Sequence, residues 1–421
     1  MRDAPITTAP EARWPTISIA ELAEVVTKGT TPTSVGHQFT EDGVNFVKVE
    51  AISPNGAFVL SKFAKVSKQC HDTLRRSQLQ AGDILFSIAG ALGRTAIVSP
   101  EILPANTNQA VGIIRLRQDA PVERRFLLHA LSPSLMLDQI EAQRGGVAQQ
   151  NLSLAQIKAM RVPLPPLEEQ KRIVAVLDQA FAALDRARAH AEANLANSAE
   201  LFDAELNEVF GQPPANWHQC RLGDVCSKIG SGATPRGGAD AYKSEGVALI
   251  RSLNVHDRDF RTAKLAFIDD EQATKLSNVI VEEDDVLFNI TGASIARCSM
   301  VENHILPARV NQHVAILRPD ATRLLPSFLT FFMTASDQKK QLLETGAEGG
   351  ATRQAITKTQ LQSLPVRFPA DVEAQKALVE KLRISEFRCR NAAANYVKQL
   401  DDNSYLRQSL LQKAFSGQLT A

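Results

Sequence analysis

Asp83 and Asp285 are the residues whose type and position come nearest to catalytic chemistry. Each carboxylate precedes an apolar run, residues 84–88 and 286–290, at matching places in the chain. Two such carboxylates could serve as a general acid and a general base. A polar turn leading into a buried strand explains them better, because Asp side chains readily accept hydrogen bonds from nearby backbone in turns. We therefore expect both to be structural.

The cysteines and histidines predict no metal site. The five cysteines form no CxxC pair, and none of the eight histidines is followed by another at the fourth position. Cys220 and Cys226 lie near His218, but their spacing fits no zinc pattern. Scattered cysteines, odd in number, indicate reduced thiols and a cytoplasmic protein.

Known catalytic motifs are also absent. Gly-Lys never occurs, so there is no phosphate loop, and the Gly-rich stretch at residues 230–235 lacks the third glycine of a dinucleotide site. No nucleophile elbow, zinc-protease motif or adenosylmethionine loop is present. The N-terminus has no apolar core, and the run at residues 324–335 is short and interrupted, so we expect no signal peptide and no membrane span.

An internal repeat dominates the organisation of the chain. Trp14 recurs as Trp217, an offset of 203 residues (217 − 14 = 203). The same offset carries Thr31 onto Thr234, and the dipeptide at 108–109 onto that at 311–312. This period is too long for a solenoid unit, so the chain consists of two similar halves. The 421 residues allow two to four domains, and the net charge of +1 neither supports nor excludes nucleic acid binding.

Each half reads as a mixed domain followed by one long helix. Short β-branched runs predict strands at 45–49, 83–88 and 111–116, and again at 247–251, 285–290 and 314–317. A helical piece is expected at 122–142, and Pro-rich connectors at 162–166 and 364–369. Long helices are predicted from 167 to about 210 and from about 371 to 415, because both stretches lack Gly and Pro.

The long helices are expected to pair with each other in antiparallel fashion. Apolar residues recur near heptad spacing, through Leu177, Leu184 and Ala191 in the first helix. The apolar face of the second is predicted to include Leu382, Phe387, Val397, Leu406 and Phe415. About 40 residues at roughly 1.5 Å each form a rod near 60 Å. That length is comparable with about 18 base pairs at about 3.4 Å rise, so we interpret the helices as a spacer between the two domains.

The motifs, taken in order and twice over, resemble the specificity subunits of type I restriction–modification systems. They include Thr31-Pro32 and Thr234-Pro235 after glycine-containing turns, and the Asp83 and Asp285 strands. The most specific is the connector at 162–170, with the C-terminal stretch at 410–419 beside it. The second connector, at 369–375, is degenerate, which makes the start of its helix less certain.

This resemblance implies an α+β fold with two repeated target-recognition domains, each followed by a long helix, the helices forming an antiparallel coiled coil. It also implies a non-catalytic phage-defence protein whose two domains each read half of an asymmetric bipartite site in double-stranded DNA. Two methyltransferase subunits would dock on the helices, and the restriction subunits would join through them. S-adenosylmethionine, ATP and Mg²⁺ are expected on those partners. The four segments are 1–165 (first domain), 166–212 (central helix), 213–369 (second domain) and 370–421 (C-terminal helix).

The repeat also sorts candidate DNA contacts. If the halves read different sequences, residues shared by both copies should contact the phosphate backbone, and residues that differ should read bases. The Asn-Gln dipeptides at 108–109 and 311–312 could pair with adenine, but because they recur unchanged we favour hydrogen bonding inside the fold. The expected backbone contacts are Thr31, Lys48, Arg94, Thr234, Arg251 and Arg297.

Residues that differ between the copies are the expected base readers. Asn106 faces Arg309 across the repeat, and amides suit adenine whereas Arg suits guanine. An ordinary polar loop remains the alternative for each of them. The set is His37, Gln38, Asn106, Gln149, Gln150, Arg236, Tyr242, Lys243, Arg309, Arg353 and Gln354.

Two other classes of protein compete with this interpretation. A coiled-coil scaffold that binds only proteins would also have two seamed helices and a near-neutral charge. A self-sufficient methyltransferase or nuclease would require catalytic motifs, and the sequence has none.

Overall fold

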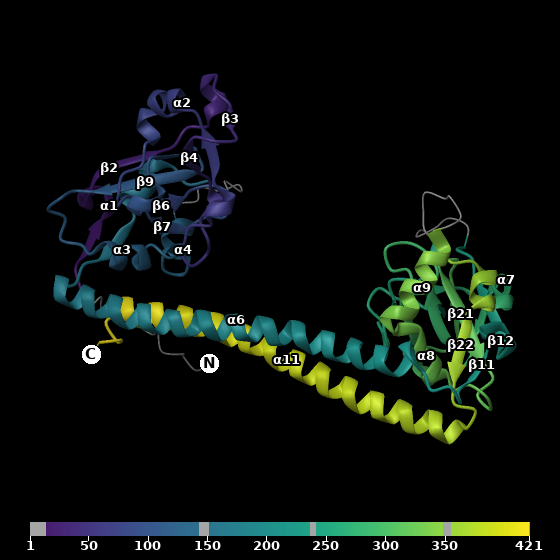
Figure 1. Cartoon of the computed structure of the whole chain (residues 1–421). Coiled ribbons are helices and arrows are strands. Elements are labelled where there is room, and N and C mark those ends of the chain that lie inside the picture. The colour runs from purple at the N-terminus through teal and green to yellow at the C-terminus, as the bar shows by residue number, and fades with distance from the viewer. Residues whose placement is uncertain (1–13, 143–150, 236–240, 348–354, 421) are drawn as a thin grey trace, which may run out of the picture. The chain divides into compact units, whose positions relative to one another are not determined.

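The structure is a computed structural model in which the chain forms two compact units (Figure 1). The first comprises Met1–His190 and Gln399–Ala421, and the second Ala191–Lys398. Each unit holds one mixed α/β domain and one end of each of two long helices. The predicted α+β class, with repeated domains and long helices, is confirmed. The described residues are 14–142, 151–235, 241–347 and 355–420.

The core of the first domain is built on two four-stranded sheets. Their strand orders are β2-β9-β6-β7 and β3-β5-β4-β8, and β4 runs parallel to β8. The strands are β2 (Ala23–Lys28), β3 (Phe39–Thr40), β4 (Val44–Val47), β5 (Ala64–Val66), β6 (Ile84–Ser87), β7 (Thr95–Ile97), β8 (Ala105–Thr107) and β9 (Val111–Leu116). The helices are α1 (Ile19–Leu22), α2 (Lys68–Thr73), α3 (Arg124–Ala130), α4 (Pro133–Ala142) and α5 (Leu154–Ala159).

The second domain repeats the central strands of this topology, with a different edge strand in its second sheet and an additional two-stranded hairpin. Its sheets have the orders β12-β21-β18-β19 and β16-β13-β20-β17, with β13 parallel to β20. The strands are β12 (Cys226–Ser231), β13 (Val247–Ile250), β14 (Val255–His256), β15 (Asp259–Phe260), β16 (Ala266–Ile268), β17 (Ile280–Val281), β18 (Val286–Asn289), β19 (Cys298–Met300), β20 (Ala308–Val310) and β21 (Val314–Pro319). The helices are α7 (Asp270–Lys275), α8 (Pro326–Thr334), α9 (Ser336–Ala347) and α10 (Lys358–Ser363).

The offset of 203 residues found in the sequence also relates equivalent positions in the two folded domains. The parallel pairing places Phe46 beside Asn106 in the first domain and Leu249 beside Arg309 in the second. Both partners are displaced by the same 203 residues. Differences between the halves can therefore be compared position by position.

The ends of each domain meet beside a long helix. β1 (Thr16–Ser18) pairs with β10 (Arg161–Pro163), and β11 (His218–Arg221) pairs with β22 (Pro365–Phe368), both antiparallel. The prolines in these connectors favour extended backbone. The helices α6 (Leu167–Gly211) and α11 (Val372–Ser416) begin directly after them.

One buried glutamine fastens the start of each long helix to its domain. Gln170 Nε2 donates to the carbonyls of Pro121 and Pro165 at 3.0 and 2.8 Å, and its Oε1 accepts from Glu123 N at 2.7 Å. Gln375 makes the same three bonds to Arg323 O, Pro369 O and Leu325 N. Both side chains are fully buried. The degenerate second connector therefore starts its helix in the same way as the first.

The long helices run antiparallel in each unit. In the first unit Asn403 of α11 donates to Leu184 O of α6 at 2.8 Å, whereas Thr420, just beyond α11, donates to Glu169 near the start of α6. In the second, Glu205 contacts Lys381 and Ser385, whereas residues 195–202 line a groove with 386–393.

The predicted apolar face of α11 is partly wrong. Phe387, Val397 and Leu406 are exposed, whereas the buried residues include Val379, Leu382, Leu411 and Ala414. Val379 and Leu382 are three residues apart, as are Leu411 and Ala414. Larger apolar side chains at other positions, such as Phe387, made this spacing hard to recognise in the sequence.

His129 gives the first unit a pH dependence. Its ring is largely buried between α3 and α6, with Nε2 at 3.2 Å from Asp178 Oδ1 and an edge contact to Phe181. Burial lowers the pKa of His129 below 6.5 and outweighs the opposing effect of Asp178. The unfolded chain then binds more protons, so the free energy of unfolding should fall as the pH drops below about 6.5.

The His129→Gln variant tests this expectation. Its urea unfolding should lose part of the wild-type decline in stability between about pH 7 and 5. Identical pH profiles for the variant and the wild type would show that His129 is not the group responsible.

Candidate nucleic-acid interface

A three-residue polar turn joins the two sheets in each domain. Asn108 Oδ1 accepts from Ala110 N at 3.2 Å, and Asn311 Oδ1 accepts from His313 N at 3.0 Å. The asparagines are therefore occupied within the turn, as the sequence analysis favoured. The glutamine next to each one is exposed to solvent.

A glycine lets the preceding strand approach this turn closely. A Cβ on Gly29 would lie 2.0 Å from Thr107 O, and one on Gly232 would lie 1.7 Å from Val310 O. No side chain fits at either position. The close approach brings Thr31 and Thr234, two residues further on, against the turn.

Each of these threonines holds the neighbouring glutamine. Thr31 Oγ1 donates to Gln109 Oε1, and Thr234 Oγ1 donates to Gln312 Oε1. The two threonines, predicted as backbone contacts, are thus occupied by a side-chain partner in the described structure. The glutamine amide is the exposed group that they hold.

The second domain extends this pair into a longer network. Gln312 Nε2 lies 3.1 Å from His313 Nε2, and His313 Nδ1 lies 2.5 Å from Thr291 Oγ1. An amide nitrogen can only donate, so Nε2 of a neutral His313 accepts and its Nδ1–H donates to Thr291. Ile88 N donates to Ala110 O in the first domain, and Ile290 N donates to His313 O in the second. Ala110 is therefore the counterpart of His313, and Ala89 is the counterpart of Thr291. Neither alanine side chain can join such a network.

A hollow of about 730 Å³ opens beside this network in the second domain. Four separate segments of the domain contribute to it, and its surface includes both polar and apolar groups. It is lined by Ser252, Leu253, Thr291, Gly292, Ala293, Ser294, Arg297, His313 and Ala355.

Arg94 and Arg297 occupy matching positions but make different contacts. Arg94 donates to Ile52 O at 2.8 Å and so braces a neighbouring loop. In the second domain the corresponding loop is held by Asn289, whose Nδ2 donates to Ser252 O and Val255 O at 2.9 and 3.4 Å. Arg297 is thereby free to reach His256 at 3.4 Å and to line the hollow. Of these two predicted backbone contacts, Arg297 lines the hollow, whereas Arg94 holds the loop at Ile52.

The predicted contacts Lys48 and Arg251 each lie over an aromatic ring, a pairing that the sequence did not reveal. Lys48 Nζ lies 4.5 Å from the centre of the Phe39 ring, and the Arg251 guanidinium lies 5.1 Å from that of Tyr242. The aromatics themselves are 203 residues apart. Each pair keeps a cation at the domain surface over a ring, a contact that is favourable by about 0.5–1 kcal/mol at exposed sites.

The contrast between Asn106 and Arg309 has a structural cause, which corrects the prediction of Asn106 as a base reader, whereas Arg309 stays a prediction. Asn106 is fully buried, and its Nδ2 donates to Leu74 O and Ser77 Oγ at 3.1 and 3.0 Å. Arg309 donates to Ala273 O and Ala308 O at 3.2 and 2.9 Å, and desolvation lowers its pKa. Asn106 lies on the edge strand β8 and Arg309 on β20, and each side chain donates to a carbonyl in or beside a short helix, Leu74 O after α2 and Ala273 O in α7.

The remaining predicted readers are only partly placed. His37 lies 3.2 Å from Thr73 Oγ1, Gln38 is exposed, and Lys243 contacts Asp269 at 3.3 Å. These three stay predictions. Those that lie outside the described residues are Gln149, Gln150, Arg236, Arg353 and Gln354.

Asp83 and Asp285 are structural, as expected, but with partners that the sequence analysis missed. Arg115 contacts Asp83 through two bonds of 2.8 Å, and Arg318 contacts Asp285 at 2.7 and 2.8 Å. Both carboxylates are buried. Each bidentate pair ties the first residues of a central strand to its neighbour.

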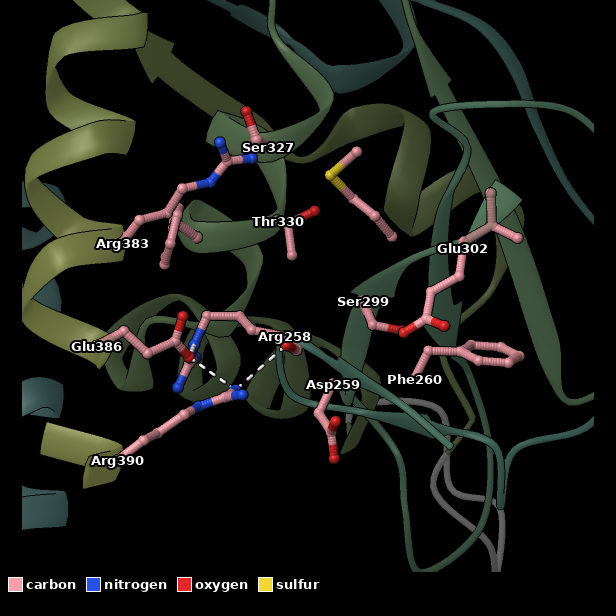
Figure 2. Close-up of a pocket in the computed structure, with 13 residues that line it drawn as sticks. Arg258, Asp259, Phe260, Ser299, Glu302, Ser327, Thr330, Arg383, Glu386 and Arg390 are labelled. Atoms are coloured by element: carbon pink, nitrogen blue, oxygen red, sulfur yellow. Dashed lines mark hydrogen bonds and ion pairs between the residues drawn. The ribbon is translucent and has the colours of Figure 1, made fainter. Parts of the chain in front are cut away.

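A second hollow, of about 340 Å³, lies between the second domain and α11 (Figure 2). Glu386 there contacts Arg258 at 2.8 Å and Arg390 at 2.9 Å, as the dashed lines show in part. Arg258 also stacks over Phe202 of α6 at 4.8 Å. These contacts anchor the β14–β15 hairpin to both long helices within the second unit.

Among the residues that the structure describes, no group of three or more His, Cys, Asp or Glu side chains is placed to hold a metal ion. In the same part of the chain, no helix combines the length and apolar character needed to cross a membrane.

The chain is thus a duplicated protein of two similar domains, each with an exposed turn glutamine and followed by a long helix. Residues 11–193 and 214–385 each match the family described as the type I restriction modification DNA specificity domain. Together these segments cover most of the chain. The chain therefore belongs to the specificity subunits of type I restriction–modification systems.

Individual relatives agree with this assignment. The EcoBI specificity subunit of Escherichia coli is 32% identical over 42% of this chain and 37% of its own length, so the match spans well under half of that relative. The putative MjaX specificity subunit of Methanocaldococcus jannaschii is 23% identical over 88% of this chain and 86% of its own.

Solved structures show the same fold. A chain from a study of complex assembly and conformational transition of the type I R-M system has a TM-score of 0.78 at 21% identity, covering 98% of this chain and 100% of that one. The crystal structure of the HsdS subunit from Thermoanaerobacter tengcongensis has a TM-score of 0.58, also at 21% identity, covering 97% and 98%.

Proposed function

We propose that this chain selects DNA for a type I restriction–modification complex, with each domain reading one half of an asymmetric bipartite site. The observation that carries the proposal is the polar turn present in both domains, embedded in different surroundings. The turn geometry is shared, whereas His313, Thr291 and the hollow beside them belong to the second domain. Shared scaffold with divergent surface is what two unequal half-sites require.

The long helices are proposed to serve as spacer and as docking surface. Among the described residues of α6 and α11, several large apolar side chains are exposed, including Leu201, Phe387 and Tyr405 at 64%, 66% and 70%. Exposed apolar side chains on helices of this length fit a protein partner. We assign that place to two methyltransferase subunits, through which the restriction subunits join.

The chain itself is proposed to be non-catalytic and cytoplasmic. S-adenosylmethionine, ATP and Mg²⁺ are assigned to the partner subunits. The buried carboxylates nearest to a catalytic pair, Asp83 and Asp285, are each held by an arginine. Methyl transfer by this chain alone, measured with labelled S-adenosylmethionine and a duplex, would contradict the proposal.

Binding selection tests the reading function directly. The chain is assembled with the methyltransferase subunits encoded beside it and mixed with randomised duplexes, and the retained DNA is sequenced. The expected result is one motif of two unequal halves separated by a fixed gap. Retention without any sequence preference would favour the protein-only scaffold instead.

Lys48→Ala is expected to weaken binding evenly across sequences. Each phosphate contact contributes about 0.9 to the slope of log affinity against log salt, so the slope should fall by about one unit. Titrations of salt against the selected duplex provide the measurement. The control is Lys171→Ala in α6, whose ammonium contacts Glu168 at 2.8 Å. An unchanged slope for Lys48→Ala would remove Lys48 from the set of phosphate contacts.

A further inference from the structure

The two turn glutamines, Gln109 and Gln312, remain exposed at the same place in both domains. The sequence analysis favoured an internal role for them, because they recur unchanged. In the structure it is the adjacent asparagines that close the turns, and the glutamine amides extend outward to a threonine hydroxyl.

Each threonine hydroxyl holds one end of the glutamine amide at the turn. In the structure Thr31 donates to Gln109 Oε1, and Thr234 donates to Gln312 Oε1, so the oxygen lies on the threonine side in both domains. A hydroxyl can also accept, so the contact holds the amide in place and leaves it a donor and an acceptor in either orientation. In the second domain Gln312 Nε2 also lies 3.1 Å from His313 Nε2, a second contact that holds the amide.

Each amide keeps unused bonding capacity. The oxygen has two lone pairs and the nitrogen two hydrogens, and the threonine uses one lone pair. His313 takes one hydrogen of Gln312. Within the described residues, no other bond of either amide is present, so each retains one free acceptor position and at least one free donor.

We propose that Gln109 and Gln312 each read an adenine, at equivalent positions of the two half-sites. An acceptor and a donor side by side match the N6 amino group and N7 of adenine in the major groove, the bidentate pairing that Asn and Gln form. Because the two readers are identical and identically held, they recognise a base that the two unequal halves have in common. This inference rests on the proposed function, since it requires that each domain reads DNA.

Thr31 and Thr234 are then positioning residues. They contact the glutamine rather than the base, and they hold its donor and acceptor in place. Loss of the hydroxyl should weaken the preference for adenine without a matching loss of total DNA binding.

The test is a selection from randomised duplexes by the assembled complex with its methyltransferase subunits. The wild type should select adenine at one position in each half. With Gln312→Ala, the preference at the second-half position should fall from roughly 5- to 150-fold to near onefold, while the first half is unchanged. Gln109→Ala is the matched control and should affect only the first half. Thr234→Val should give an intermediate loss at the second-half position.

A change of chemistry provides a stricter arm. Gln312→Glu leaves two acceptors, which suit the N4 amino group of cytosine, so the preferred base should change from adenine to cytosine. Adenine preference retained in Gln312→Ala, or an equal loss of binding to all sequences, would overturn the inference. A two-part motif persisting in those same variants would leave the proposed function standing, and comparison of thermal unfolding separates loss of reading from loss of fold.

Discussion

Asp285→Ala is expected to lower the free energy of unfolding of the second domain by about 3–5 kcal/mol, because it leaves Arg318 partly buried without its buried partner. Asp285 is fully buried, and its carboxylate accepts two bonds from Arg318 and one from Glu282 N at 2.7 Å. Removal of the carboxylate therefore leaves the Arg318 cation with only the exposed Glu282 carboxylate as its counter-charge, and it leaves the Glu282 backbone N–H unsatisfied. Urea unfolding followed by circular dichroism measures the loss.

The same arginine supplies a matched control. The Glu282 carboxylate also contacts Arg318, but its side chain is 58% exposed. Glu282→Ala should cost less than about 1 kcal/mol, because exposed ion pairs contribute little. Replacement of both partners, with Asp285→Leu and Arg318→Met, should recover part of the loss. Equal effects of Asp285→Ala and Glu282→Ala would contradict a buried pair.

Gln375→Leu is expected to destabilise the second unit by about 2–4 kcal/mol. The substitution keeps the apolar bulk but removes three buried hydrogen bonds, and it leaves the Arg323 and Pro369 carbonyls and the Leu325 N–H unpaired. The start of α11 should then separate more easily from its domain. Hydrogen exchange at the Leu325 amide, together with denaturant unfolding, measures both effects.

Two further variants serve as comparisons for the effect of Gln375→Leu on stability. Gln170→Leu removes the equivalent bonds in the first unit and should have a similar cost. Lys376→Ala changes the next residue in the helix, whose side chain is exposed and pairs with Glu373, and should cost less than about 0.5 kcal/mol. If Gln375→Leu were as mild as Lys376→Ala, the glutamine would not be an anchor.

Much of the fold could be predicted because its elements are local. β9 coincides with the predicted strand at 111–116, and α6 with the predicted helix, because β-branched runs and long stretches without Gly or Pro act over neighbouring residues. The internal repeat supported the remaining elements, because the same elements are predicted at matching positions in both halves. The helical piece at 122–142 divides into α3 and α4 at Pro133, where proline removes a backbone donor.

The site was harder to predict, because its partners are distant in sequence. Asp83 meets Arg115, and Thr31 meets Gln109 across 78 residues. Comparison of the two copies correctly marked Thr31 and Thr234 as equivalent, but it cannot tell an inward side chain from an outward one. Asn106 and Arg309 differ because each donates to a different carbonyl in or beside a short helix. The same comparison, applied to Ala110 and His313, would have found the network beside the hollow.

The central claim is that each domain reads one half of the site independently. The most direct test replaces residues 213–369 with the equivalent domain of a relative, assembles the chimera with the methyltransferase subunits, and maps methylated sites in genomic DNA. Assembly is checked by mass measurement. The expected result is a motif in which one half changes while the other half and the gap are retained. A motif that changes in both halves, or one that does not change at all, would contradict the account.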